Sequence, residues 1–283
     1  MKVKIITDST CDFGKELLEK LDIFCIPLMV NFSDKTFLDG VEITTEQLYE
    51  KVEEYNELPK TAAVPIHTFI EVFEKYLNEG YEVVYTGISR QMSRTYENAI
   101  LASRELDETK IHVVDSMNLS TGIGLLLLKA AKYRDQGLSG KEIADKLNVD
   151  NKRVLSQFAV ETMEYLHKGG RCSSIAKLFG TFLKIKPIIA VRDGKMSVAS
   201  KPRGRMKVAL DVLIEQLKED LPRLDRDAVI ITHSLGFESE RYIREQIQGF
   251  LGDVQIISTV AGCVISSLCG RGTIGILYMV NED

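Results

Sequence analysis

The sequence predicts an α/β protein of two domains, and three observations lead to this prediction. The chain has 283 residues, more than most single-core domains contain. In its N-terminal half, short β-branched runs alternate with helical patterns, which is typical of a mainly parallel sheet flanked by helices. Further along, Asp193-Gly194 stands between two short strand-like runs and indicates an antiparallel hairpin. We therefore expect an N-terminal α/β domain over residues 1–152 and a C-terminal α/β domain with an antiparallel element over residues 153–283.

The N-terminal half repeats the order strand, loop, helix. Apolar, β-branched runs mark the strands, and apolar residues at helical spacing mark the helices. The apolar run from Gly122 to Ala131 is far shorter than the roughly 20 residues of a membrane span, so it predicts a buried helix. By these patterns we expect strands at 2–7, 24–32, 82–88 and 111–114, and helices at 14–21, 45–55, 67–77, 94–106, 122–136 and 140–147.

The pattern changes after about residue 152. A glycine-rich turn, Lys168-Gly169-Gly170-Arg171, follows the next strand-like run, and the Asp-Gly hairpin comes after it. The remaining elements alternate between strand and helix up to the end of the chain. We expect strands at 154–160, 187–191, 195–200, 228–233, 254–260 and 274–280, and helices at 206–218, 238–250 and 261–268.

Charge and cysteine content exclude several classes of function. The net charge of −5 argues against a nucleic-acid-binding protein, which would concentrate Lys and Arg on one face. The five cysteines form neither a C-x-x-C pair nor a Cys/His cluster at zinc-ligand spacing, so we expect free thiols, no disulfide and no metal.

A strand begins almost at Met1 and leaves no room for a signal peptide. We therefore expect a cytoplasmic protein without stable membrane insertion.

Polar residues follow three strands of the predicted parallel sheet. They are Asp8-Ser9-Thr10, the segment Ser89 to Thr95, and Asp115-Ser116. Ligands of such sheets bind at the carboxyl ends of the strands, so these loops are candidates for a binding site. Helix N-caps and turns favour the same residue types for backbone reasons, so a structural role stays open for each loop.

Sequence signals for cofactor binding or catalysis are weak. Gly270 to Gly275 matches G-x-G-x-x-G, but a strand rather than a helix follows it, so we expect a tight turn near an anion and no dinucleotide. The chain has no G-x-S-x-G or H-E-x-x-H motif. Of its four histidines only His233 ends a predicted strand, and a structural role is the better interpretation for it. We therefore expect no catalytic residue and no cofactor.

Several motifs, in order along the whole chain, resemble those of the DegV family. Each motif is short, but their number and their order make the resemblance specific. They are Asp8-Ser9-x-x-Asp12, Leu38 to Ile43, Lys60-Thr61-Ala62, Met92 to Tyr96, Asp115-Ser116 with Ser120, Gly122 and Gly124, Tyr165 to Arg171, Lys186-Pro187, Asp193-Gly194, and Lys201-x-Arg203-Gly204-Arg205.

The resemblance implies a protein that binds a long-chain fatty acid and is not itself an enzyme. The tail would lie in an apolar tunnel of the C-terminal domain, and hydroxyl groups at the mouth, here Thr61 and Ser93, would hold the carboxylate. The resemblance also implies a partner, the catalytic subunit of a fatty-acid kinase, which would phosphorylate the carboxyl group. Arg171 and Arg203 match positions suited to binding that phosphate or docking the kinase.

The sequence departs from the family pattern in three places near the expected mouth. Leu268 replaces the family's head-group histidine, Ala62 lacks a hydroxyl, and Arg94 replaces a glycine. The resemblance therefore implies acyl-chain binding more strongly than acyl-phosphate formation. We expect Arg94 or Arg271 to pair with the carboxylate, with Ser267 beside them.

A second hypothesis is an enzyme. It would act on a small phosphorylated or carboxylated metabolite at the strand ends and would use Asp8, Ser93 and Asp115.

Overall fold

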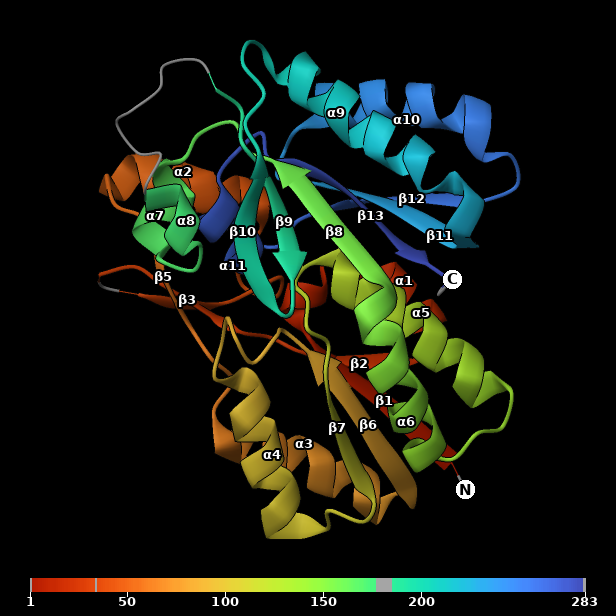
Figure 1. Ribbon diagram of the computed structural model, residues 1–283. Helices are drawn as coiled ribbons and strands as arrows, with labels where there is room; N and C mark the ends of the chain where they lie inside the picture. The colour runs from red at the N-terminus through yellow and green to blue at the C-terminus, as the bar shows by residue number, and fades with distance from the viewer. Residues whose placement is uncertain (1, 34, 177–184, 282–283) are drawn as a thin grey trace.

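The computed structural model describes residues 2–33, 35–176 and 185–281. They form three sheets, and Figure 1 shows the parallel sheet below and the largest, mixed sheet above it. The division into an N-terminal parallel unit and a C-terminal unit with antiparallel strands is therefore confirmed. The domain boundary at residues 152 and 153 stays a prediction.

The N-terminal sheet has four strands in the order β2-β1-β6-β7, and all of them are parallel. Two helices cover one face and three cover the other, and each face contributes to its own apolar core. The strands are β1 (Lys2–Asp8), β2 (Ile23–Ile26), β6 (Tyr81–Gly87) and β7 (Ile111–Asp115). The helices are α3 (Ile66–Asn78) and α4 (Thr95–Leu106) on one face, and α1 (Lys15–Lys20), α5 (Thr121–Asp135) and α6 (Gly140–Asp150) on the other.

The strand expected over residues 24–32 is wrong, because the chain changes sheets at Pro27. Proline has no N–H group to continue a ladder, and the N–H of Leu28 donates to the hydroxyl of Ser9 at 3.1 Å. The chain then enters a three-stranded antiparallel sheet that the sequence did not predict. Its order is β4 (Thr36–Leu38), β3 (Met29–Asn31), β5 (Lys60–Ala62), and α2 (Thr45–Tyr55) lies between β4 and β5 in the chain.

The C-terminal sheet has six strands in the order β10-β9-β8-β13-β11-β12. Only β11 and β12 pair in parallel. The predicted hairpin is confirmed: Asp193 (φ 50°) and Gly194 (φ 76°) both adopt the left-handed backbone that a two-residue turn between twisted strands requires. The strands are β8 (Val154–Ala159), β9 (Ile188–Arg192), β10 (Lys195–Ser200), β11 (Leu224–His233), β12 (Gln255–Val260) and β13 (Ile274–Val280).

Helices of the C-terminal unit lie on both faces of this sheet. The helices are α7 (Glu164–Gly169), α8 (Ser173–Ala176), α9 (Met206–Glu219), α10 (Phe237–Leu251) and α11 (Cys263–Cys269). Short 3₁₀ turns in the described parts of both units are η1 (Ser9–Cys11), η2 (Asn151–Arg153) and η3 (Leu221–Arg223). Figure 1 shows α9 and α10 together on the outer side. The short helices α7 and α11 contact each other on the side that faces the N-terminal unit.

Helix α5 connects the two large sheets, and the predicted buried helix is confirmed. It contacts strands of both sheets and is apolar on almost every side, as a helix packed between two layers must be. Its one buried cation, Lys129, donates to Asp225 at 2.7 Å and to Asp227 at 2.8 Å. Among the described residues, no helix has the length and apolar character needed to cross a membrane.

Candidate functional site

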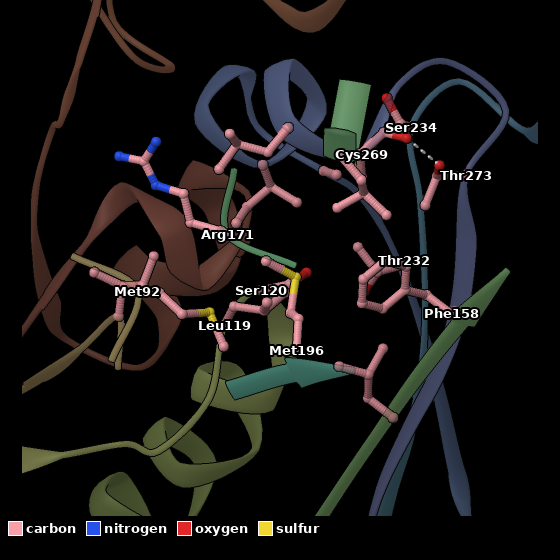
Figure 2. Close-up of a pocket in the computed structure, with 17 residues that line it drawn as sticks. Met92, Leu119, Ser120, Phe158, Arg171, Met196, Thr232, Ser234, Cys269 and Thr273 are labelled. Carbon is pink, nitrogen blue, oxygen red and sulfur yellow. Dashed lines mark hydrogen bonds between the residues drawn. The ribbon is translucent and has the colours of Figure 1, made fainter. Parts of the chain in front are cut away.

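An apolar cavity lies between the C-terminal sheet, α11 and the loops at the carboxyl ends of the parallel strands (Figure 2). The space that the centre of a water-sized sphere can occupy in it is about 50 Å³, so the cavity is narrow. Its walls come from segments that are far apart in the chain. Apolar contributors include Ile88, Met92, Leu119, Phe158, Ile265 and Leu277.

Four hydroxyl groups of the described residues line this cavity, and each of them is hydrogen-bonded to another group of the protein. Ser120 donates to Asp12 at 2.5 Å, and Thr273 donates to the carbonyl of Cys269 at 2.8 Å. The Thr232 hydroxyl bonds those of Thr121 and Thr259 at 2.5 and 3.1 Å. Ser234 bonds Tyr49 and Ser266 at 2.6 and 2.7 Å. A hydroxyl whose hydrogen bonds are already made offers little to a polar ligand, so the cavity suits an apolar one.

A second, polar cavity of about 470 Å³, measured in the same way, adjoins the first. Three arginines, Arg90, Arg94 and Arg171, line it together with Thr61, Gln91 and Ser93, and none of the described residues in its lining is acidic. Within the described residues, Arg90 pairs with Asp115 at 3.3 Å, whereas Arg94 and Arg171 form no ion pair. Arg171 donates to the carbonyl of Gly169 at 2.7 Å. Two exposed guanidinium groups are thus available to an anion in this cavity.

The two cavities share four lining residues, Ile88, Met92, Arg171 and Leu268. Figure 2 shows the guanidinium of Arg171 pointing away from Phe158 and Thr232, which lie at the other end of the apolar cavity. The aliphatic stem of Arg171 therefore lines the apolar cavity while its charged end lies toward the polar one. A ligand with an apolar tail and an anionic head would fit across this junction.

Local structure positions the polar residues of the mouth. Thr61 lies on β5 opposite Val30 of β3, in the sheet that the sequence did not predict. The Ser93 hydroxyl accepts from the Thr95 N–H at 3.2 Å and bonds the Thr95 hydroxyl at 2.9 Å, directly before α4 begins. The positive end of the α4 dipole therefore lies at the same cavity. Arg94 is the N-cap residue of this helix.

Glycines shape the junction on its other side. Helix α7 ends at Gly169 and is capped by Gly170, whose φ of 68° directs the chain into Arg171. A β-carbon on Gly169 would lie 2.8 Å from Cδ2 of Leu268, so Gly169 leaves the space that Leu268 fills. A β-carbon on Gly270 would lie 2.9 Å from the ring of Tyr165. The two glycine-rich segments therefore pack together beside the junction.

Three of the residues assigned to the site from the sequence lie elsewhere. Ser267 is buried in α11 and donates to the carbonyl of Val264 at 2.8 Å. The guanidinium of Arg271 lies 5.8 Å from the ring centre of Tyr49. Arg203 pairs with Ile185 in an isolated β-bridge. None of the three is among the described residues that line the two cavities.

The acids of the enzyme hypothesis do not reach either cavity. Asp8 is fully buried and accepts from Thr10 N–H, Tyr85 hydroxyl and Ile88 N–H at 3.0, 2.7 and 3.0 Å. Burial raises the pKa of the Asp8 carboxyl. Asp115 accepts from the Met117 N–H at 2.9 Å and pairs with Arg90. Of the three residues in that hypothesis, only Ser93 lines a cavity.

The remaining candidates have structural partners. His233 ends β11, and its Nδ1 accepts from the Gly236 N–H at 3.2 Å. In the glycine turn, the N–H groups of Gly270 and Gly272 donate to the carbonyls of Ser266 and Ser234 at 2.9 and 2.7 Å, so they are not directed at an anion. No cluster of three metal-binding side chains occurs in the described part of the chain.

The sequence did not identify the apolar walls of the site. Met92 lies inside one of the family motifs, so that motif pointed to it, but Phe158 and Leu277 belong to ordinary strand patterns. No local signal separates a strand residue that faces a cavity from one that faces the core, because both are apolar and both alternate with period two.

Comparison with known proteins is consistent over the whole chain. A family model described as an uncharacterised protein of the DegV family matches residues 2–281. A DegV domain-containing protein from Clostridium perfringens is 35% identical over 278 residues, which covers 98% of each chain. The solved structure titled as fatty acid binding of a DegV family protein from Thermus thermophilus has a TM-score of 0.92 at 27% identity and covers 99% of this chain and 100% of its own. Bacillus subtilis DegV, described as a fatty acid binding protein, has a TM-score of 0.88 at 29% identity, with coverage of 99% and 100%. The chain belongs to the DegV family.

Proposed function

We propose that this protein binds a long-chain fatty acid, with the tail in the apolar cavity and the carboxylate in the polar cavity. One observation carries the proposal: the hydroxyls of the apolar cavity are hydrogen-bonded to protein groups, and this cavity adjoins one whose described lining has two arginines without an acidic partner and no acid. The solved relatives from Thermus thermophilus and Bacillus subtilis are described as fatty-acid-binding proteins, which supports the same ligand class.

In this arrangement the carboxylate is held by Thr61, Ser93, Arg94 and Arg171. Ser93 keeps its own O–H proton for the ligand when the Thr95 hydroxyl is the donor in the bond between these two side chains. The Thr61 hydroxyl has no hydrogen bond to a described side chain, so it is available to the ligand. Arg94 lies at the positive end of α4. Arg94 rather than Arg271 is the cation near the head group, because only Arg94 lines the polar cavity. The side chain of Leu268 makes the neck apolar where the family has a histidine.

Burial of the tail supplies most of the affinity. At about 0.8 kcal/mol per methylene, a tail of roughly 16 carbons contributes on the order of 12 kcal/mol before the costs of binding are subtracted. Release is then slow, and a carrier with slow release needs a partner that acts on the bound ligand.

We further propose a fatty-acid kinase as that partner, in the cytoplasm. The polar cavity would leave a carboxylate oxygen accessible for phosphorylation, and Arg171 at the junction is placed to contact the new phosphate. Arg203 lies outside both cavities and is proposed only for docking the kinase. The kinase would supply all of the catalysis, in accord with the positions of Asp8 and Asp115.

Native mass spectrometry of the purified protein tests the fatty-acid proposal first. We expect a mass excess that disappears on denaturing extraction and an extract that contains a stoichiometric fatty acid. A protein that emerges empty and also fails to bind added oleate and palmitate would contradict the proposal. A bound phosphorylated metabolite instead of a lipid would favour the enzyme hypothesis.

A further inference from the structure

We propose that Asp12 and Asp39 are positioning residues for the apolar cavity: they hold the start of helix α11, which forms one wall of this cavity, and so set how fast a bound ligand leaves. This role rests on the proposed function, because it concerns release of the ligand. Both residues belong to sequence motifs of the N-terminal unit, and the proposed function gives neither of them a task. Neither is among the described residues that line the apolar or the polar cavity.

The start of α11 is capped by residues of the other unit. Its own N-cap residue is Gly262, which has no side chain to accept from the first N–H groups of the helix. Asp12 accepts from the Gly262 N–H at 2.8 Å. Asp39 accepts from the N–H groups of Cys263 and Val264 at 2.7 and 3.4 Å. Two carboxylates of the N-terminal unit therefore hold the beginning of a helix that belongs to the C-terminal unit.

Further hydrogen bonds keep each carboxylate in place. The Ser120 hydroxyl donates to the second oxygen of Asp12 at 2.5 Å, and the Ser9 hydroxyl donates to Asp39 at 2.8 Å. Asp12 and Ser120 have φ angles of 55° and 53°, in the left-handed region that is costly for most residues other than glycine. Strained backbone on both sides of one hydrogen bond indicates that the surrounding fold maintains this contact.

Gly262 provides the space that the two carboxylates need. Its φ of −64° is open to any residue, so the backbone alone does not require a glycine here. A β-carbon at this position would lie 3.2 Å from Oδ1 of Asp12 and 3.2 Å from Oδ1 of Asp39. The missing side chain therefore lets both acids approach the start of the helix.

Helix α11 carries this contact to the ligand cavity. Its residues Ile265, Leu268 and Cys269 line the apolar cavity. Short elements of a protein open locally as units, so a start that is held less firmly lets all three side chains move. A wall that moves more often releases a bound tail faster.

The same hydrogen bonds separate the apolar cavity from a third cavity of about 490 Å³, measured in the same way. Ser120 lines the apolar cavity, whereas Asp12, Asp39 and Gly262 line the third one. The bond between Ser120 and Asp12 therefore crosses the partition between the two. When the partition opens, water gains access to the tail, and the tail loses part of its hydrophobic stabilisation.

Asparagine is a close substitute for each of these acids. Burial raises the pKa of both carboxyl groups, and the charge of Asp39 adds to the shift of Asp12. An uncharged amide keeps one oxygen to accept from the helix, and its NH₂ group can donate to a serine hydroxyl. Asparagine variants therefore preserve most of the hydrogen bonds, whereas alanine removes them.

The test measures ligand release from the full chain. cis-Parinaric acid, a fluorescent fatty acid, serves as the probe, because the chain contains no tryptophan whose fluorescence would interfere. Excess oleate displaces it in a stopped-flow experiment. We expect Gly262→Ala to accelerate release by about tenfold, because the new β-carbon displaces both carboxylates and removes no other group. Asp39→Ala should act in the same direction, and Asp39→Asn should stay within about threefold of the wild-type rate.

Two further variants separate this effect from a general loss of stability. Gly249→Ala in α10 is the matched control, because nothing lies within 4 Å of its β-carbon, and it should release the probe at the wild-type rate. Asp220→Ala removes the acceptor of the buried Tyr278 hydroxyl, which donates at 2.6 Å on the outer side of the C-terminal sheet. It should lower the resistance to urea and leave the release rate unchanged.

Hydrogen exchange of the empty proteins supplies a readout that needs no ligand. The amides of Gly262, Cys263 and Val264 should exchange faster in Gly262→Ala than in the wild type. Release at the wild-type rate from Gly262→Ala, or equal acceleration in Asp220→Ala, would overturn the role of the two acids and leave the proposed function intact. A wild-type protein that takes up no parinarate would overturn the proposed function and this role with it. Gly262→Ala decides the question even if Asp39→Ala does not fold.

Discussion

The apolar and polar cavities adjoin, yet their polar groups differ in whether the protein already provides a partner for them. In the apolar cavity, the hydroxyls of Ser120, Thr232, Ser234 and Thr273 all bond to protein groups. In the polar cavity, Arg94 and Arg171 have no acidic partner among the described residues. The comparison teaches that residue type alone does not make a wall polar, because a satisfied hydroxyl behaves toward a ligand almost as an apolar surface does.

The strongest test of this comparison enlarges the apolar cavity. Phe158 of β8 lies opposite Gly275 of β13, and a β-carbon on Gly275 would lie only 2.9 Å from Cβ of Phe158. We expect Phe158→Ala to deepen the cavity, so that the extracted fatty acids shift toward longer chains. The free energy of unfolding of the empty protein should fall by about 3 kcal/mol.

Extraction with mass spectrometry and urea unfolding measure these two effects. Phe158→Leu is the matched control, because it keeps most of the apolar volume and should change both quantities less. An unchanged distribution of chain lengths in the loaded Phe158→Ala protein would show that this side chain does not limit the tail. An empty wild-type protein would instead contradict the fatty-acid proposal itself.

The next test reverses charge in the polar cavity. The double variant Arg94→Glu with Arg171→Glu should weaken oleate binding by at least about tenfold, because it removes two exposed cations, each worth about 1 kcal/mol or less, and adds repulsion. Arg271→Glu is the control, since Arg271 lies against Tyr49 and lines neither cavity. Equal losses in a binding titration of the two proteins would place the carboxylate elsewhere.

A smaller effect is expected when a hydroxyl is removed from the apolar wall. Thr232→Val deletes the hydroxyl that bonds Thr121 and Thr259 and keeps the shape of the side chain. Oleate affinity should stay within about twofold, while the free energy of unfolding falls by about 1 kcal/mol. A large loss of affinity would mean that this hydroxyl contacts the ligand, and the comparison of the two cavities would fail.

The smallest expected effect concerns pH. Burial lowers the pKa of His233 at the end of β11, although the charge of Glu240 opposes the shift. The unfolded chain, in which the pKa is about 6.5, therefore binds protons more readily than the folded protein, so stability falls as pH decreases below about 6.5. His233→Asn keeps an acceptor for the Gly236 N–H. It should reduce this dependence in urea unfolding at neutral and mildly acidic pH, and an unchanged slope would contradict the assignment.

The sequence by itself determined the architecture of the two large sheets. Alternation of strands and helices predicted the parallel sheet, Asp193-Gly194 predicted the hairpin, and the apolar run after Gly122 predicted the buried helix α5. These features depend on local backbone preferences and on short periodicities, which are properties of neighbouring residues. Motifs in order along the chain also identified the family.

Only the tertiary structure decided which residues surround the site. It divided the expected strand at Pro27 and placed Thr61 in a third sheet, and it brought Arg94 to the polar cavity while Arg271 lies against Tyr49. It also directed the hydroxyls of the apolar wall into the protein. The physical reason is that the direction and the hydrogen-bond partner of a side chain depend on residues that are distant in sequence, and local patterns carry no information about them.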